Sequence, residues 1–324
     1  MRLGTGGQLG YYGLIALAAA MWGTLGVLTK HLYEYGVSPW SLTFLRTLLG
    51  FLAFGGVILF LDRSRFRVRR RDLPYLALFG LISTSIFYAL YLYTISLTSV
   101  AVAAVLLYTA PVFAAIMARF AFGEAITPPK VVALLLTFAG CVLVAGLESG
   151  APVVTPLGIG TGLGSALTYA SFGIMGKKAG QRNCHWTINF YSMGFATLFL
   201  LPVLALPEVS LWPYQTEVWL LLAVMTAGPT LASRALYVGA VKHVEASRAA
   251  IVATVEPVAA AAFAFLLLGE LLSSSQLMGG FLVLAGSVLA QQPGRPDAEP
   301  RDQGGAPAKR DVLASTSASL QQDR

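Results

Sequence analysis

Three ionisable side chains lie deep inside long apolar stretches of this sequence: Arg46, Arg234 and Glu256. A charged side chain within a membrane helix costs about 2.5–3.5 kcal/mol on insertion scales, so such residues usually face a cavity or an oppositely charged partner. Their types indicate two kinds of chemistry. Guanidinium groups bind anionic groups of a solute, and a carboxyl group in a low-dielectric cavity can take up and release a proton.

Arg46 lies about a third of the way into the apolar stretch 39–61. A guanidinium pairs with a carboxylate through two parallel hydrogen bonds, so Arg46 is a candidate anchor for a substrate carboxylate. The alternatives are a fixed salt bridge, or a side chain that extends toward the lipid headgroups.

Arg234 and Glu256 lie in two successive apolar stretches. The simplest expectation is that they form an ion pair that holds these two segments together. The alternative is that Glu256 accepts a proton and couples its transfer to that of a substrate. Arg234 would then be free to contact the substrate.

Aromatic and amide side chains lie at positions where they can line a cavity. Small-molecule pockets are mostly apolar, with a few placed polar groups, and this set fits an amphipathic solute. The alternative for each residue is simple packing. The candidates are Trp22, Tyr88, Tyr91, Tyr108, Tyr169, Asn189 and Tyr237.

Two prolines, Pro111 and Pro257, lie at equivalent places inside apolar stretches. A proline removes a helix hydrogen bond and kinks the helix. Matched kinks are candidate hinges, and a static kink needed only for packing is the alternative.

The elements that position these residues are membrane helices. Hydrophobic residues make up 56% of the chain and charged residues 11%, against roughly 25% charged in soluble domains. A helix of about 20 apolar residues crosses a bilayer core. The sequence predicts an all-α integral membrane protein with ten transmembrane helices: 11–30, 39–61, 74–96, 99–120, 129–147, 157–177, 186–206, 217–239, 247–268 and 275–292.

The chain repeats itself at an offset of 146 residues. Pro111-Val112 returns as Pro257-Val258, and Ala89-Leu90-Tyr91 as Ala235-Leu236-Tyr237. Each copy holds five predicted spans, an odd number, so the second copy enters the membrane in the opposite orientation. Inverted repeats place a substrate site near the midplane between the copies. We expect repeats at 11–147 and 157–292.

Basic residues gather in the loops of one side, above all between residues 63 and 71. The positive-inside rule makes this the cytoplasmic side, so both termini are predicted to be cytoplasmic, in a multi-pass protein of the cell inner membrane. Residues 1–10 form the N-terminal cytoplasmic segment. The tail 293–324 is rich in Pro, Gly, Ser and charge, and is predicted to be a disordered cytoplasmic tail.

The chain resembles the EamA family of the drug/metabolite transporter superfamily over about residues 12–292. The resemblance rests on the five-plus-five repeat, on Glu256-Pro257-Val258, and on Gly123-Glu124 and Gly269-Glu270 at the ends of spans four and nine. It implies a central cavity between helices one to four and six to nine, alternating access, and export of small metabolites. The two Gly-Glu pairs are expected to lie at membrane interfaces, where they cap helices or stabilise a gate.

We therefore predict a secondary transporter that exports amino acids or related amphipathic metabolites, with protons as a candidate partner. A sugar-phosphate or nucleotide-sugar antiporter and a channel-like facilitator stay open as alternatives. No enzyme, cofactor, metal or nucleic-acid role is expected, and Cys141 and Cys184 should be free thiols. Small residues in spans five and ten could support a homodimer or only close packing within the chain: Gly140, Gly146, Gly280 and Gly286.

Overall fold

The computed structural model describes residues 5–98, 100–145, 155–211, 214–268 and 273–292, and none of these lies in a β-strand. The first half of the chain contains α1 (Thr5–Gly23), α2 (Leu25–Glu34), α3 (Pro39–Leu61), η1 (Arg63–Phe66), η2 (Arg70–Asp72), α4 (Leu73–Gly80), η3 (Leu81–Ile86), α5 (Phe87–Leu97), α6 (Val100–Leu107), α7 (Ala110–Phe122) and α8 (Pro128–Ala145).

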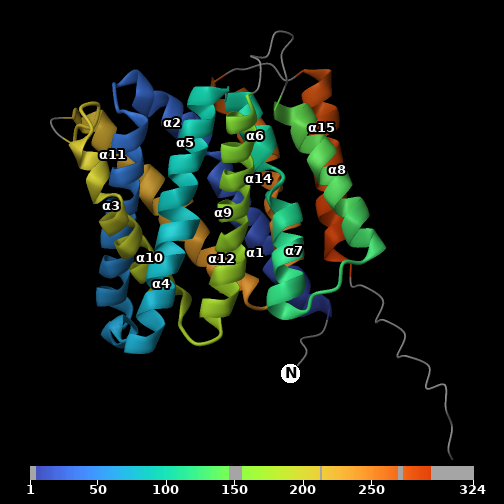
Figure 1. Cartoon of the computed structure of the whole chain (residues 1–324), viewed down its shortest axis with the longest axis horizontal. Coiled ribbons are helices and arrows are strands. Elements are labelled where there is room, and N and C mark those ends of the chain that lie inside the picture. Colours follow the sequence, from blue (N-terminus) through green and yellow to red (C-terminus); the bar gives the residue numbers. More distant parts are fainter. Residues whose placement is uncertain (1–4, 99, 146–154, 212–213, 269–272, 293–324) are drawn as a thin grey trace, which may run out of the picture. The chain divides into compact units, whose positions relative to one another are not determined.

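The second half contains α9 (Pro156–Gly180), α10 (His185–Phe199), η4 (Leu201–Ala205), α11 (Thr216–Met225), η5 (Thr226–Ala232), α12 (Ser233–Val241), α13 (Ala246–Ala253), α14 (Val255–Leu268) and α15 (Ser274–Gln291). Figure 1 shows these helices running roughly side by side.

Eight helical segments within the described residues are long and apolar enough to cross a membrane: Gln8–Glu34, Pro39–Leu61, Arg70–Leu97, Val102–Phe122, Pro128–Ala145, His185–Ala205, Thr216–Val241 and Ala246–Leu267. They coincide with eight of the predicted spans. The other two predicted spans coincide with α9 and α15, helices of 25 and 18 residues. The protein is therefore an all-α membrane protein, and the crossing of the bilayer by α9 and α15 remains a prediction.

Local sequence signals explain where several helices begin and end. The Ser38 side chain accepts a hydrogen bond from the Ser41 amide and precedes Pro39, and Thr155 does the same for α9 ahead of Pro156. Gly123 ends α7 in the left-handed conformation, at a φ of 69°, which L side chains rarely adopt.

The first helix of each half packs among helices of the other half. α1 contacts α12, α13 and α14, and α9 contacts α5, α6 and α7. Helices of both halves therefore surround the centre of the protein. This interleaving is the physical counterpart of the repeat in the sequence.

α8 and α15 lie side by side (Figure 1, right), and glycines bring their backbones together. A Cβ atom on Gly140 would lie 2.6 Å from the carbonyl oxygen of Gly279, and one on Gly286 would lie 2.9 Å from that of Ala133. These small residues therefore serve contact within the chain. Gly146 lies outside the described residues.

Several predicted spans are not continuous α-helices. Span four breaks between α6 and α7 at Tyr108, and span nine breaks between α13 and α14 at Thr254, 146 residues later. Pro111 and Pro257 lie in the first turn after each break, where a missing amide hydrogen does little harm. Spans three and eight carry π-helical segments, η3 and η5, also at equivalent places.

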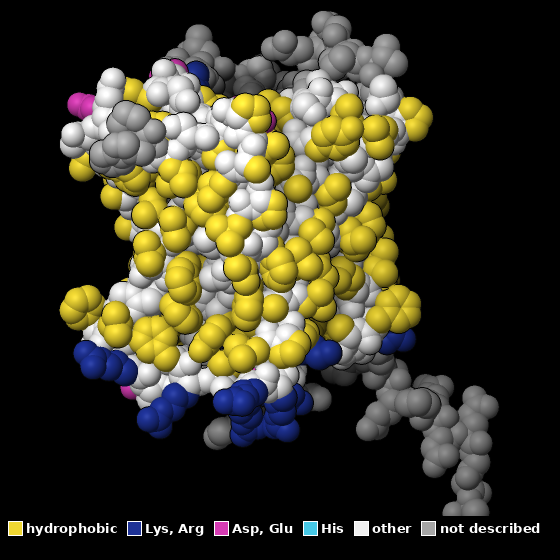
Figure 2. All heavy atoms as spheres, turned by 60° about the vertical axis from the view of Figure 1, so that its left-hand side comes forward, with side chains coloured by type: hydrophobic (Ala, Val, Ile, Leu, Met, Phe, Trp, Pro, Cys, Tyr) yellow, Lys and Arg dark blue, Asp and Glu magenta, His cyan; other side chains and the backbone are white. Residues whose placement is uncertain are grey.

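Charge separates the two ends of the helices. Figure 2 shows hydrophobic side chains over the middle of the protein and Lys and Arg side chains gathered at one end. Large apolar side chains such as Phe60 and Phe281 are exposed, as expected of a lipid-facing surface.

Candidate functional site

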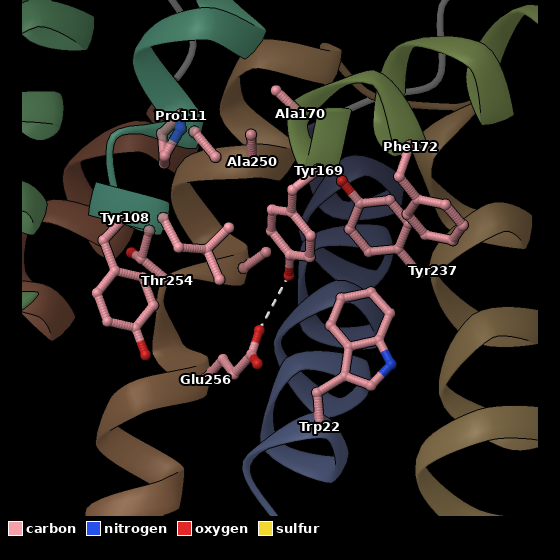
Figure 3. A pocket seen from close by; sticks show the side chains of 13 residues that line it. Trp22, Tyr108, Pro111, Tyr169, Ala170, Phe172, Tyr237, Ala250, Thr254 and Glu256 are labelled. Atoms are coloured by element: carbon pink, nitrogen blue, oxygen red, sulfur yellow. Dashed lines mark hydrogen bonds between the residues drawn. The ribbon is translucent and has the colours of Figure 1, made fainter. Parts of the chain in front are cut away.

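A cavity lies beside the helix breaks of spans four and nine, where they meet α1, α9 and α12 (Figure 3). The cavity is small and opens in part to the surroundings. Both halves of the chain contribute to its wall. The lining residues are Trp22, Leu107, Tyr108, Ala110, Pro111, Tyr169, Ala170, Phe172, Tyr237, Ala250, Ala253, Thr254 and Glu256.

Glu256 is the ionisable acid of this cavity. It is the second residue of α14, directly after the break at Thr254, so its carboxylate lies at a helix N-terminus, where the backbone dipole favours negative charge. The Tyr169 hydroxyl donates a hydrogen bond of 2.9 Å to Glu256 Oε2. This carboxylate thus has a single hydrogen-bond donor among the described residues and faces the cavity.

Aromatic rings form the opposite wall. The Trp22 ring centroid lies 5.3 Å from that of Tyr237 and 6.1 Å from that of Phe172, and Phe172 lies 5.3 Å from Tyr237. These rings come from α1, α12 and α9. Such a wall offers π-faces and broad apolar surface to a bound molecule.

The sequence profile of the EamA-like transporter family matches this chain twice, over residues 9–146 and 156–291. The chain belongs to the EamA-like transporter family. The predicted resemblance is thereby confirmed, and the double match accounts for the repeated five-helix unit.

Relatives agree with this assignment, and a solved structure shares the fold. The chain is 34% identical over 282 residues to an uncharacterized transporter of Archaeoglobus fulgidus, covering 85% of this chain and 94% of the relative. It is 24% identical to an uncharacterized transporter of Clostridium kluyveri, covering 86% and 92%. A solved crystal structure has the same fold, with a TM-score of 0.75 at 19% identity over 86% of this chain and 96% of the other.

Six of the predicted site and hinge residues of this EamA-like transporter line the cavity: Trp22, Tyr108, Pro111, Tyr169, Tyr237 and Glu256. Tyr88, Tyr91 and Pro257 are not part of its wall. The rings of Tyr88 and Tyr91 pack on Phe87, at centroid distances of 4.9 and 5.8 Å, and Phe87 in turn contacts Tyr169.

Arg46 lies behind the cavity rather than in its wall. Its Nε donates to Thr230 Oγ1 at 3.1 Å, and its guanidinium carbon lies 5.5 Å from the Tyr88 ring centroid. Thr230 is fully buried in η5. The Arg46 side chain therefore points into the protein and does not extend to the headgroups.

The predicted ion pair between Arg234 and Glu256 is wrong. Arg234 Nε donates instead to Asn189 Oδ1 at 3.3 Å, and its guanidinium stacks 4.5 Å from the Phe172 ring centroid. Asn189 also donates to backbone carbonyls of His185 and Arg234, so this predicted cavity residue is a fully buried support for the arginine. Both groups instead contact side chains of α9: Glu256 contacts Tyr169, and Arg234 contacts Phe172.

Sequence reasoning missed Phe172, Thr230 and Thr254. Phe172 follows Tyr169 by three residues, which places the two on one helix face and is a usable signal. Thr230 precedes Arg234 by four residues and could be found in the same way. Thr254 lies three residues before Pro257, and its counterpart at the 146-residue offset is the predicted cavity residue Tyr108, so both features are usable signals.

Glu124 occupies a second buried site, at the charged end of the protein. Its carboxylate accepts hydrogen bonds from Lys177 Nζ (2.8 Å), the Ala246 amide (2.7 Å), the Ser247 amide (3.1 Å) and Ser247 Oγ (2.5 Å). Burial alone would raise the pKa of Glu124, but the Lys177 charge and these hydrogen bonds outweigh it and lower the pKa below its ordinary value.

Glu124 therefore caps α13, a helix other than its own, and is only 9% exposed. The prediction of a capping role is correct in kind, but the side chain is not at a solvated interface. The equivalent pair Gly269-Glu270 lies outside the described residues. Among the described residues no group of three His, Cys, Asp or Glu side chains could hold a metal ion, and Cys141 and Cys184 are free thiols.

Proposed function

We propose that this EamA-like transporter is a secondary transporter that exports amino acids or related amphipathic metabolites by alternating access. The observation that carries the proposal is the cavity itself, which is built from both repeats at their helix breaks. A cavity between inverted repeats is where a rocking motion exposes a solute first to one side and then to the other.

The chemistry of the wall supports an amphipathic substrate. Aromatic rings provide apolar contact, and Glu256 provides one site for a hydrogen-bond donor or a positive charge. An ammonium group over the faces of Trp22 and Tyr237 would gain cation–π attraction as well.

Glu256 is the proposed coupling residue. Its sparse hydrogen bonding and its position in the cavity would let it exchange a proton with substrate or solvent. Pro111 and Pro257 are the proposed hinges, since each follows a helix break at an equivalent place in its repeat. We propose further that the basic end is cytoplasmic, in the inner membrane, with both termini on that side.

The test is uptake of labelled amino acids into proteoliposomes, with and without a pH gradient, for the wild type and Glu256→Gln. Saturable flux that the gradient accelerates and the variant loses would support a proton-coupled carrier. Gradient-independent flux without counter-stimulation would indicate a channel-like facilitator. Exchange confined to sugar phosphates or nucleotide sugars would replace the amino-acid proposal by an antiporter.

A further inference from the structure

Arg46 is half-buried and Arg234 is buried, and neither forms an ion pair with a carboxylate among the described residues. Arg46, on α3, donates a hydrogen bond to Thr230. Thr230 and Arg234 are four residues apart on one continuous helical segment, so the Arg46 contact and Arg234 lie on the same side of that segment. The ion pairs of the described residues use Asp62, Asp72, Glu124 and Glu245, and none of them involves Arg46 or Arg234.

The Arg234 side chain is incompletely satisfied. Its Nη2 is buried and has no hydrogen-bond partner, although the residue is only 8% exposed. A buried charged donor that lacks a partner is strongly unfavourable, and native proteins keep such groups mostly for a ligand or for a functional reason. Asn189 and the Phe172 ring stabilise part of the guanidinium and leave this nitrogen unused.

Phe172 connects the arginines to the cavity. Its ring carries the Arg234 guanidinium on one face, 4.5 Å away, and the same residue lines the cavity. The guanidinium is thus separated from the cavity by no more than one aromatic ring. A rotation of the Phe172 side chain would expose Nη2 to a bound molecule.

We propose that Arg234 and Arg46 form a subsite for the carboxylate group of the substrate, while Glu256 receives its ammonium group. This inference rests on the proposed transport function and names what each end of the cavity recognises. Two guanidiniums stand against the single carboxyl group of Glu256 in this region, so the carboxylate of a bound substrate would meet an excess of positive charge. A guanidinium binds a carboxylate through two parallel hydrogen bonds.

The experiment compares four probes that share one apolar body: phenylalanine, phenethylamine (no carboxylate), 3-phenylpropanoate (no amine) and phenyl phosphate. Binding to the detergent-solubilised full chain is measured by thermal shift, and transport is measured in proteoliposomes. The variants are Arg234→Gln, Arg234→Lys and Arg46→Gln. Arg65→Gln is the control, because Arg65 is a partly exposed arginine outside the cavity, paired with Asp62.

The expected result is that phenylalanine and 3-phenylpropanoate stabilise the wild type. Arg234→Gln and Arg46→Gln should weaken the binding of both by about 10- to 100-fold, the loss expected for a charge-assisted hydrogen bond. Binding of phenethylamine should stay within about twofold, Arg234→Lys should restore part of the loss, and Arg65→Gln should match the wild type.

Equal weakening of phenethylamine would overturn the proposal, because the arginines would then serve only the fold. Selective stabilisation by phenyl phosphate would replace the carboxylate by a phosphate group. The two proposals fail separately. Carboxylate binding without transport would overturn the transport function alone, whereas transport of phenylalanine that is unchanged in Arg234→Gln would overturn the subsite alone.

Discussion

Two carboxylates, the buried Glu124 and the half-buried Glu256, are used in opposite ways by this protein. Glu124 accepts four hydrogen bonds, one of them from the ammonium group of Lys177, and joins α7, α9 and α13 at the charged end. Glu256 accepts one hydrogen bond, from Tyr169, and faces a cavity. Both residues are glutamates, and each carboxylate lies at a helix N-terminus: that of α13 for Glu124 and that of α14 for Glu256.

The difference lies in how fully the negative charge is compensated. A carboxylate surrounded by donors is fixed in one protonation state and one position, which suits a structural joint. A carboxylate with a single neutral donor can bind a cation or a proton, because its remaining lone pairs are unused. The number of hydrogen-bond donors therefore distinguishes the structural residue Glu124 from the candidate functional residue Glu256.

The largest expected effect comes from Glu124→Ala. It would leave Lys177 without its carboxylate and the amides of Ala246 and Ser247 uncapped. Removing one partner of a buried ion pair costs about 3–5 kcal/mol. We expect a large drop in thermal stability and in folded yield, measured by fluorescence-detected size-exclusion chromatography. Glu34→Ala, at an exposed glutamate, is the control. A Glu124→Ala protein as stable as the wild type would contradict the structural role of Glu124.

Glu256→Gln should have the second largest effect, on transport rather than on folding. The amide keeps the shape and can still accept from Tyr169, but it cannot carry a proton or a negative charge. We expect transport to fall about 10- to 100-fold with near-normal folded yield, measured in proteoliposomes. Glu217→Gln, at an exposed glutamate, should transport normally; a Glu256→Gln protein that fails to fold would make both acids structural.

Tyr169→Phe should have an intermediate effect. It removes the single hydrogen-bond donor of Glu256 and keeps the ring in the cavity wall. A side-chain hydrogen bond contributes about 1 kcal/mol, so transport should change by about fivefold and its pH dependence should shift. Tyr191→Phe is the matched control, since the Tyr191 hydroxyl donates to a backbone carbonyl outside the cavity. If the pH profile of transport is the same in Tyr169→Phe as in the wild type, the Tyr169 hydroxyl does not influence the protonation of Glu256.

The smallest expected effect is a pH dependence of stability that belongs to Glu124. Its pKa in the folded protein lies below the ordinary value of 4.5. Its stabilising contribution is therefore complete above that value and is lost as the pH falls through the lowered pKa. Thermal unfolding of the wild type and Glu124→Gln should differ most at neutral pH and converge in acid. A difference that is constant down to acid pH would contradict the ionic role.

The sequence predicted the helices well and their interactions less well. Span positions follow from apolar length alone. Of the predicted cavity aromatics, Trp22, Tyr169 and Tyr237 line the cavity, whereas Tyr91 packs on Phe87 instead. The partner of Arg234 could not be predicted in this way. An apolar stretch in the sequence identifies which side chain lies inside the protein. It does not identify which residue of another helix that side chain contacts.

The same limit explains Glu124. A glutamate at the end of an apolar stretch looks solvated in the sequence, and only the position of α13 reveals that it is buried. The π-helical form of η3 and η5 was not predicted, although Pro229, which lies inside η5, predicts an irregular turn in span eight.

The π-helical segments η3 and η5 bear on the evolutionary origin of the two halves. They occupy equivalent places in the two halves, and so do the breaks at Tyr108 and Thr254. A feature present in both copies is most simply inherited from the single five-helix ancestor that was duplicated. The charges differ, since the counterparts of Arg46, Arg234 and Glu256 are Ser192, Tyr88 and Ala110. By this reasoning the irregular backbone is older than the duplication, and the polar groups that set the chemistry of each half diverged after it.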